Sequence, residues 1–312
     1  MPRKIKNIAV IVSDIDNEYQ NNIIKGIKKY SEEYDVNVAS FIAFTGYFSN
    51  MRHDIGEYNI YNLINFDYFD GVILVTNTIT SPTMQKRIFS KIRETGIPAV
   101  SINFDIEDFY SICIDNEKAM ENIVRHFVGH HGCRTINYIS GPLGNPESNQ
   151  RINAYRRVLA EYGIPTDERR IFYGTFLGED GPVAVNDFIK SGLPMPEVII
   201  CANDEMALTT ILELQKQGYN VPNDIMVSGF DNIYSARTNS PKLTTVECPH
   251  LLSGYHACKI IQGHYDGVNQ PRYMTLNTTP IYSESCGCDT GISDDITEFR
   301  KKNFLNLKMY ST

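Results

Sequence analysis

Six polar residues that could contact a ligand each follow a short apolar run, three in each half of the chain. In the first half they are Asn17 after IAVIVS, Asn77 after GVILVT and Asn103 after PAVSI. In the second half they are Asn145 after INYIS, Asn203 after EVIICA and Asp231 after IMVSGF. Ligands of parallel α/β sheets bind beyond the carboxyl ends of the strands. Any one of these residues is explained more simply as a helix cap or turn former. The set of six predicts two lobes that face one cleft.

The apolar runs that precede these residues are short and β-branched, and helical patterns separate them. The clearest helical pattern covers residues 83–95 and ends at Gly96 and Pro98. The alternation then begins again, with a helical pattern over residues 116–131 followed by Gly132. Alternating strands and helices predict parallel sheets with right-handed crossovers. The predicted fold class is therefore α/β, with two similar lobes.

Composition limits the function further. The 312 residues include 29 Lys and Arg against 37 Asp and Glu, so the net charge is −8. This charge does not provide the basic surface of a self-sufficient nucleic-acid binder. No apolar run approaches the ~18 residues that a membrane span needs. The apolar stretch at residues 8–12 is also too short for the core of a signal peptide, so we expect a cytoplasmic protein that does not bind membranes.

Residues for metal binding or catalysis are sparse in the sequence. The seven cysteines are expected to be free thiols in a reducing compartment. Cys286 and Cys288 form the one close pair, but no further residues follow metal-ligand spacing around them. Adjacent residues do not share a helix face, so His130 and His131 are expected at an exposed helix end. The Gly-x-Ser-x-Gly, Walker and His-Glu-x-x-His motifs are absent. We expect no metal site, no cofactor and no enzymatic activity.

A series of longer motifs extends over residues 6–288. The first half contains GVILV and IPAVSIN, and the second opens with ICIDNEKAMENIVRHFVGHHGCRTINYISGP. The most specific motifs follow as PEVIICANDEMAL, GYNVPNDIMVSGFDN and SPKLTTVECP. In order and spacing, these motifs resemble the effector-binding region of LacI/GalR-type transcription regulators, which shares its fold with periplasmic sugar-binding proteins.

The resemblance implies two Rossmann-like lobes joined by three crossover segments, near Asp108, Thr245 and Asn269. The N-terminal lobe would comprise residues 1–108 and 247–268, and the C-terminal lobe residues 109–246 and 269–288. It also implies a homodimer. Family regulators carry a helix-turn-helix ahead of this region, whereas the first strand here begins by Asn7. We therefore expect the chain to lack that module and not to bind DNA alone.

The resemblance also assigns candidate ligand contacts. Arg151 matches the family arginine, whose paired donors suit vicinal hydroxyls or an anion, although it could also be a solvated helix start. Asp231 matches the family's strand-end acid, which can accept from two adjacent hydroxyls. Asp204 is expected to support the site rather than touch ligand. Aromatic rings cover the apolar face of a sugar. The full candidate set is Asp14, Tyr19, Asn103, Asn145, Arg151, Phe176, Asn203 and Asp231.

Two departures from the family concern the ligand. The first loop reads Asn17-Glu18-Tyr19-Gln20 where the family often has Asn-Pro-x-aromatic, and Asn103-Phe104 stands where it often has Asp-Arg. The predicted function is a cytoplasmic sensor that binds a small molecule, a sugar or polyol, between the lobes and signals by closure. The alternative is the solute-binding protein of an ABC importer. Residues 289–312 have an amphipathic pattern, which predicts a helix that leads to an output domain.

Overall fold

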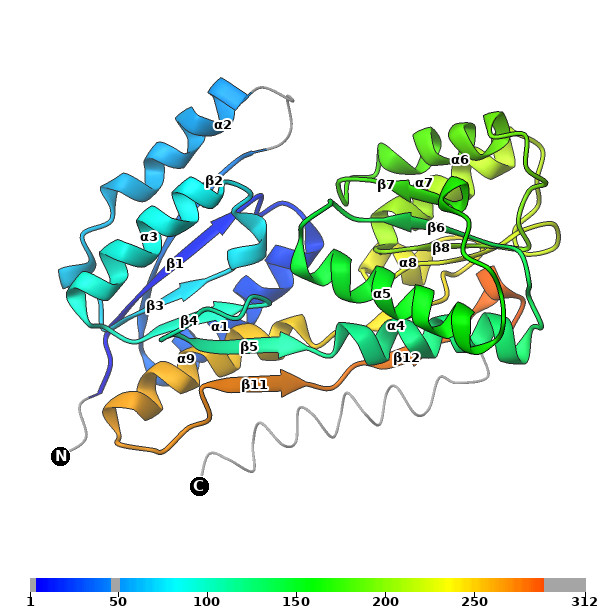
Figure 1. Ribbon diagram of the computed structural model, residues 1–312. Coiled ribbons are helices and arrows are strands. Elements are labelled where there is room, and N and C mark those ends of the chain that lie inside the picture. Colours follow the sequence, from blue (N-terminus) through cyan, green and yellow to red (C-terminus); the bar gives the residue numbers. More distant parts are fainter. Residues whose placement is uncertain (1–3, 46–50, 289–312) are drawn as a thin grey trace.

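The computed structural model describes residues 4–45 and 51–288, which form two α/β lobes side by side (Figure 1). Each lobe has a parallel sheet with helices on both faces, which confirms the predicted fold class. The predicted helix within 289–312 lies outside the described residues. Among the described residues, no helix is long and apolar enough to span a membrane.

The first lobe contains a six-stranded sheet with the order β11-β5-β4-β3-β1-β2. Its strands are β1 (Asn7–Ser13), β2 (Asn37–Ala43), β3 (Gly71–Leu74), β4 (Ala99–Ile102), β5 (Tyr110–Ile114) and β11 (Tyr273–Leu276). Its helices are α1 (Glu18–Tyr34), α2 (Met51–Glu57), α3 (Pro82–Thr95) and α9 (His250–Tyr265), with short 3-10 turns at Tyr58–Leu63, Phe66–Tyr68 and Thr76–Thr78.

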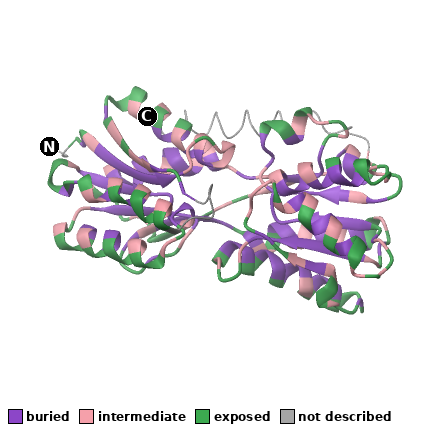
Figure 2. Cartoon of the chain, turned by 90° about the horizontal axis from the view of Figure 1, so that it is seen from above, coloured by how far each residue is buried: buried purple, intermediate pink, exposed green. Residues whose placement is uncertain are grey.

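The core of the first lobe follows from side-chain alternation along its central strand β1. Ile8, Val10 and Val12 pack with the apolar residues of α1 and α9 on one face. Ala9 and Ile11 belong to the cluster on the other face, which includes residues of α3. Both faces of a central parallel strand are buried, so its sequence is continuously apolar. Figure 2 shows the buried residues concentrated in the sheets and on the inner sides of the helices.

The second lobe contains a four-stranded parallel sheet with the order β7-β6-β8-β9. Its strands are β6 (Ile136–Ser140), β7 (Ile171–Tyr173), β8 (Val198–Cys201) and β9 (Met226–Ser228). Its helices are α4 (Asn116–Arg125), α5 (Pro146–Glu161), α6 (Asp180–Lys190), α7 (Asp204–Lys216) and α8 (Tyr234–Thr238), with 3-10 turns at Glu168–Arg170 and Glu284–Cys286. The predicted helix at 116–131 changes after α4 into a π-helix at His126–His130.

The sheets place two of the three crossings later than the sequence suggested. Strand β5 pairs with β4 in the first sheet, so the chain crosses after Ile114 and not near Asp108. Strand β11 pairs with β5, so the last crossing follows Leu276 and not Asn269. Strand β5 is mostly buried, whereas β11 is a half-exposed edge strand. The family-based boundaries did not anticipate that either strand pairs with the first-lobe sheet. Beside the second-lobe strand β9, β10 (Thr245–Glu247) pairs antiparallel with β12 (Thr279–Ile281).

Candidate functional site

A cleft of about 870 Å³ lies between the two lobes, at the carboxyl ends of the strands. Loops and helix starts from both lobes line it, as expected for open parallel sheets. Seven of the eight candidate residues line this cleft: Asp14, Tyr19, Asn145, Arg151, Phe176, Asn203 and Asp231. The eighth, Asn103, does not.

Tyr19 is the centre of a hydrogen-bond network on the first-lobe wall. Its hydroxyl donates to Asn77 Oδ1 at 3.1 Å and receives a bond from Asn103 Nδ2 at 2.7 Å. Asn103 has a φ of 59° and is only 5% exposed, so its amide is turned toward Tyr19 behind the wall. Asn103 therefore supports Tyr19, while its own Oδ1 is buried without a hydrogen-bond partner among the described residues, and its direct contact with ligand stays a prediction.

Asp14 belongs to the first-lobe wall of the cleft, directly after β1. Its φ of 58° lies in the left-handed region, and its Oδ1 accepts the backbone N–H of Thr45 at 2.8 Å. Burial raises the pKa of the Asp14 carboxyl to about 6, although the bond from Thr45 opposes the rise. This acid can therefore change its charge close to physiological pH.

Arg151 is a buried part of the second-lobe wall and not a solvated helix start. Its exposed fraction is 4%, and its guanidinium donates to Asn116 Oδ1 at 2.8 Å and to the Ala202 carbonyl at 2.6 Å. The guanidinium carbon lies 3.8 Å from the centre of the Phe230 ring. These contacts fix the guanidinium in one orientation beside the cleft.

Glu147 is a cleft residue that sequence reasoning missed. It is 5% exposed, lies one helical turn before Arg151 and pairs with it at 3.6 Å. Its Oε2 also accepts from Asn77 Nδ2 at 2.6 Å, which is a direct bond between the lobes. Burial raises the pKa of Glu147, while the Arg151 charge acts against that rise. The i, i+4 spacing of the two charges was a signal available in the sequence.

Asn145 and Asn203 line the cleft and also cap helices. Asn145 Oδ1 accepts the Ser148 N–H of α5, and Asn203 Oδ1 accepts the Met206 N–H of α7, both at 3.0 Å. The Asn203 amide also donates to the Phe176 carbonyl at 2.7 Å. It therefore holds the backbone of Phe176, whose φ is 70°. At both positions, the residue caps a helix and also lines the cleft, so the capping role does not exclude the predicted contact with ligand.

Asp231 follows the second-lobe strand β9 at the cleft and contacts the start of α9 in the first lobe. Its Oδ1 lies 3.3 Å from His250 Nε2, and His250 packs edge-on against Tyr19 with the ring centres 4.6 Å apart. Ligand atoms of Asp231, Cys248 and His250 lie within 4.8 Å of one another, so this group could hold a cation. Asp204 behind it accepts from Thr245 and from the Ile233 N–H, which agrees with the expected supporting role.

The charge of the cleft is strongly unbalanced. Five lining residues are acids, namely Asp14, Glu147, Glu179, Glu205 and Asp231, whereas Arg151 is the one basic residue among the described lining residues. That single cation already pairs with Glu147. Burial raises the pKa of Glu205 as well, with a smaller contribution from Asp231. An added negative charge would therefore be repelled, whereas hydroxyl or ammonium donors would find acceptors.

A second interlobe contact lies at the rim of the cleft. The carboxylate of Glu18, at the start of α1, accepts the backbone N–H of Tyr234 in α8 at 2.7 Å. The same carboxylate lies 3.6 Å from the guanidinium of Arg237. Together with the bond between Asn77 and Glu147, this contact holds the lobes in the conformation described.

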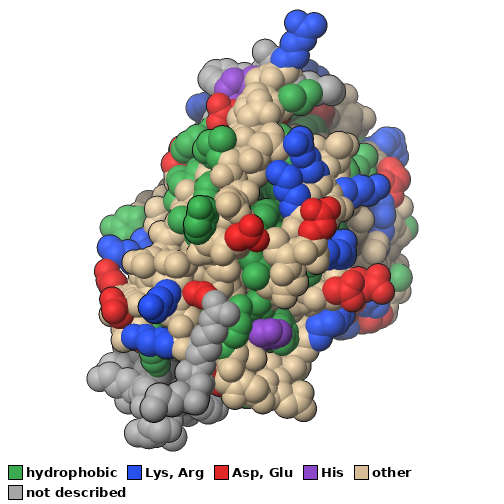
Figure 3. All heavy atoms as spheres, turned by 90° about the vertical axis from the view of Figure 1, so that its left-hand side faces the viewer, with side chains coloured by type: hydrophobic (Ala, Val, Ile, Leu, Met, Phe, Trp, Pro, Cys, Tyr) green, Lys and Arg blue, Asp and Glu red, His purple; other side chains and the backbone are tan. Residues whose placement is uncertain are grey.

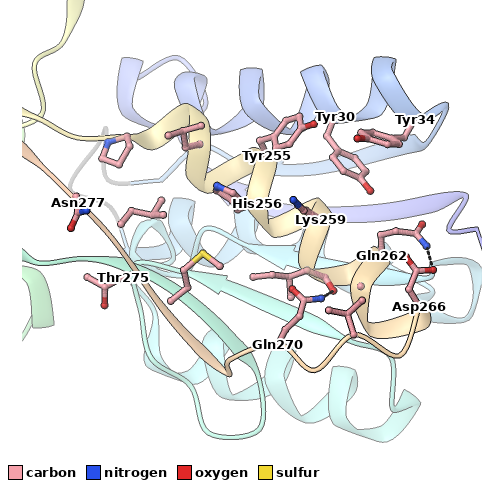
Figure 4. Close-up of a pocket in the computed structure, with 17 residues that line it drawn as sticks. Tyr30, Tyr34, Tyr255, His256, Lys259, Gln262, Asp266, Gln270, Thr275 and Asn277 are labelled. Carbon is pink, nitrogen blue, oxygen red and sulfur yellow. Dashed lines mark hydrogen bonds between the residues drawn. The ribbon is translucent and has the colours of Figure 1, made fainter. Parts of the chain in front are cut away.

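A hollow of about 750 Å³ also occurs on the outer surface of the first lobe, between α1, α9 and β11 (Figure 4). Tyr30, Tyr34 and Tyr255 lie along one side, and Gln270 and Thr275 lie along the other. None of the eight candidate residues lines it. The predicted strand-end residues therefore gather at the cleft between the lobes and not at this hollow.

The fold brings together four potential metal ligands that the sequence spacing did not connect. The sequence analysis found no further ligands around Cys286 and Cys288, and it expected His130 and His131 at an exposed helix end. The fold instead brings His126 and His131 to the two cysteines, with all four ligand atoms within 4.8 Å of one another. Sequence spacing did not reveal this group because 155 residues separate His131 from Cys286.

Curated relatives of the chain are transcriptional regulators. The HTH-type transcriptional regulator RegA of Clostridium acetobutylicum is 29% identical over 253 residues, which are 79% of this chain and 71% of RegA. Catabolite control protein A of Priestia megaterium is 27% identical over 264 residues, covering 83% of this chain and 75% of that protein. These matches confirm the resemblance at the level of an effector-binding domain.

Solved structures show the same fold. The transcriptional regulator CelR in complex with cellobiose has a TM-score of 0.78 at 22% identity and covers 91% of this chain and 85% of its own. The lac repressor dimer bound to operator and the anti-inducer ONPF has a TM-score of 0.75 at 19% identity. The alignment covers 90% of this chain and 81% of the lac repressor chain. The family described as periplasmic binding protein-like domain matches residues 124–286, and the chain therefore belongs to this family.

Proposed function

We propose that the chain senses an uncharged polyhydroxylated molecule, a sugar or polyol, that binds between the lobes and stabilises their closed arrangement. The observation that carries the proposal is the cleft itself, whose wall is built from polar strand-end side chains of both lobes. The proposed contacts are Asp14, Tyr19, Asn145, Arg151, Phe176, Asn203 and Asp231, with Asn103 supporting Tyr19.

The charge of the cleft narrows the ligand class. From the sequence, Arg151 suited either vicinal hydroxyls or an anion. Its pairing with Glu147 and the four further acids of the wall support the uncharged alternative. A sugar presents hydroxyl donors to these carboxylates and an apolar face to Phe176 and Tyr19. The CelR structure with a similar fold is a cellobiose complex, which is compatible with this class.

Closure would transmit the binding event. A ligand can shift an equilibrium between two arrangements only by its difference in affinity for them. Residues of both lobes line the cleft, so a bound molecule would gain contacts as the lobes approach. The bonds from Glu18 to Tyr234 and from Asn77 to Glu147 would add to the stability of the closed arrangement.

The relatives favour a regulator over the binding protein of an importer. We propose a cytoplasmic homodimer that does not read DNA through residues 4–288 alone. In support, residues 7–43 form β1, α1 and β2 of the first lobe. Lys and Arg also alternate with Asp and Glu on the end of the molecule seen in Figure 3. The output would then come from a domain joined to the predicted helix in 289–312.

A thermal-shift screen with matched probes tests this function. The full chain is heated with neutral sugars and polyols, and with the uronic acids of the same sugars. A ligand that prefers the folded protein raises the melting temperature by mass action. We expect a neutral compound to raise it and its uronic acid to have little effect. Stabilisation by the uronic acids alone would contradict the proposed ligand class.

A further inference from the structure

Four potential metal ligands converge on the second lobe, at the far end of α4 from the cleft. His126 Nε2 lies 3.5 Å from Cys286 Sγ and 3.6 Å from Cys288 Sγ. His131 Nε2 lies 3.6 Å from Cys288 Sγ and 3.0 Å from His126 Nε2. The group combines two imidazoles with two thiols, and no residue of the proposed ligand cleft belongs to it.

These spacings match the edges of a zinc tetrahedron. With Zn–S bonds of about 2.3 Å and Zn–N bonds of about 2.05 Å, a tetrahedral ion places S and N about 3.6 Å apart and two N atoms about 3.3 Å apart. The three S–N distances agree with that edge, and the N–N distance is slightly shorter. Tetrahedral sites of two sulfurs and two nitrogens are typical of Zn²⁺.

The π-helix after α4 is what brings the two histidines together. In an α-helix, residues five apart point about 140° away from each other. Here the His131 N–H bonds to the His126 carbonyl, which is the i to i+5 bond of a π-turn. His131 therefore lies one turn above His126 on the same side. Their spacing, His-x₄-His, is also within the usual range for zinc-binding histidines.

The two cysteines are held on a rigid turn. Gly287 between them has a φ of 80°, a conformation that glycine adopts without strain. Ser285 anchors the turn, because its hydroxyl donates to the Val227 carbonyl and accepts the Thr244 N–H. Tyr282 stacks on the His126 ring with the ring centres 3.7 Å apart. Cysteines and histidines are thus positioned by the fold and not only by each other.

We propose that His126, His131, Cys286 and Cys288 form a structural Zn²⁺ site. Four protein ligands complete the tetrahedron, so the ion has no open position for a substrate. The bound ion would fasten the segment that follows strand β12 to the end of α4. The two Nε2 atoms that face each other would then both bind the metal, instead of one donating a proton to the other.

Metal analysis of the full chain, purified under reducing conditions, tests this site. We expect one zinc per chain, and a higher melting temperature with zinc than after chelation. Cobalt reconstitution should give the visible bands of a tetrahedral ion with thiolate charge transfer, and this readout needs no variant. Absence of stoichiometric zinc and of this spectrum, after reduction and reconstitution, would overturn the proposal.

Neighbouring histidines provide a matched comparison. His131→Asn and Cys288→Ser should each lower zinc content at least tenfold at equal zinc concentration. His130→Asn changes an exposed histidine next to His131 that is outside the group, and should keep one zinc per chain. Equal loss of zinc in His130→Asn and His131→Asn would contradict the assigned ligands.

Discussion

Replacing Arg151 by methionine should destabilise the second lobe through the charge that it leaves behind. Methionine keeps an apolar stem beside Phe230 but removes the partner of Glu147, which is 5% exposed. It also removes the donors to Asn116 and to the Ala202 carbonyl. This substitution therefore separates the role of Arg151 in the fold from its proposed contact with ligand.

The expected loss follows from the burial of the pair. Removing one partner of a buried ion pair costs about 3–5 kcal/mol of folding free energy. For a unit of 150–250 residues this corresponds to a fall in melting temperature of roughly 6–20 °C. Arg157 lies on the same helix but is exposed and pairs with Glu117 and Glu121. Arg157→Met should therefore lower the melting temperature far less than Arg151→Met, because exposed ion pairs contribute little to stability.

The double variant Arg151→Met/Glu147→Gln identifies the cause. Glutamine has no charge to leave unpaired and can still bond to Asn77, so the double variant should be at least about 1 kcal/mol more stable than Arg151→Met alone. The assay is thermal and urea unfolding by circular dichroism of the unsubstituted chain, the single variants Arg151→Met and Glu147→Gln, and the double variant, with Arg157→Met as the control. If the two single losses add in the double variant, Glu147 is not the uncompensated charge and the argument fails.

Two further predictions concern pH and closure. Because the pKa of Asp14 is raised from 3.8 to about 6, its contribution to stability is present below pH 3.8 and is lost as pH rises through 6. Asp14→Asn, which tolerates the left-handed φ, should remove this loss and raise the melting temperature at pH 7; an unchanged pH profile would contradict it. Glu18→Ala should enlarge the ligand-free radius of gyration and weaken ligand binding roughly tenfold, measured by small-angle scattering and calorimetry. Glu32→Ala, which breaks a 3.6 Å pair with Lys28 on the same helix, should change neither; equal effects would refute the interlobe role of Glu18.

Strand ends were predictable from sequence because apolar runs and the polar residues that follow them are local signals. Asn145, Asn203 and Asp231 could therefore be placed at the cleft before the fold was known. The orientation of Asn103 could not be predicted from local signals, because it depends on a positive φ and on the distant Tyr19 hydroxyl. The crossings were misplaced because β5 and β11 are first-lobe strands by pairing, which the motifs do not encode.

The sequence analysis mainly missed contacts between side chains that the fold brings together. Glu147 could have been found by its i, i+4 spacing to Arg151, but its bond to Asn77 depends on how the lobes meet. His126 was overlooked because α-helical periodicity separates it from His131, whereas the observed π-turn aligns them. Local sequence patterns thus predicted the helices and strands. The contacts of Glu147 in the cleft and the approach of His126 to His131 depend on the folded structure, which those patterns do not describe.

The most direct test of the proposed sensing function combines calorimetry with small-angle scattering on the neutral compound that stabilises the chain. We predict that its saturation lowers the radius of gyration, and that Asp231→Asn weakens its binding at least tenfold while the circular dichroism spectrum is retained. Equal affinity in Asp231→Asn, or an unchanged radius of gyration at saturation, would contradict ligand binding and closure between the lobes.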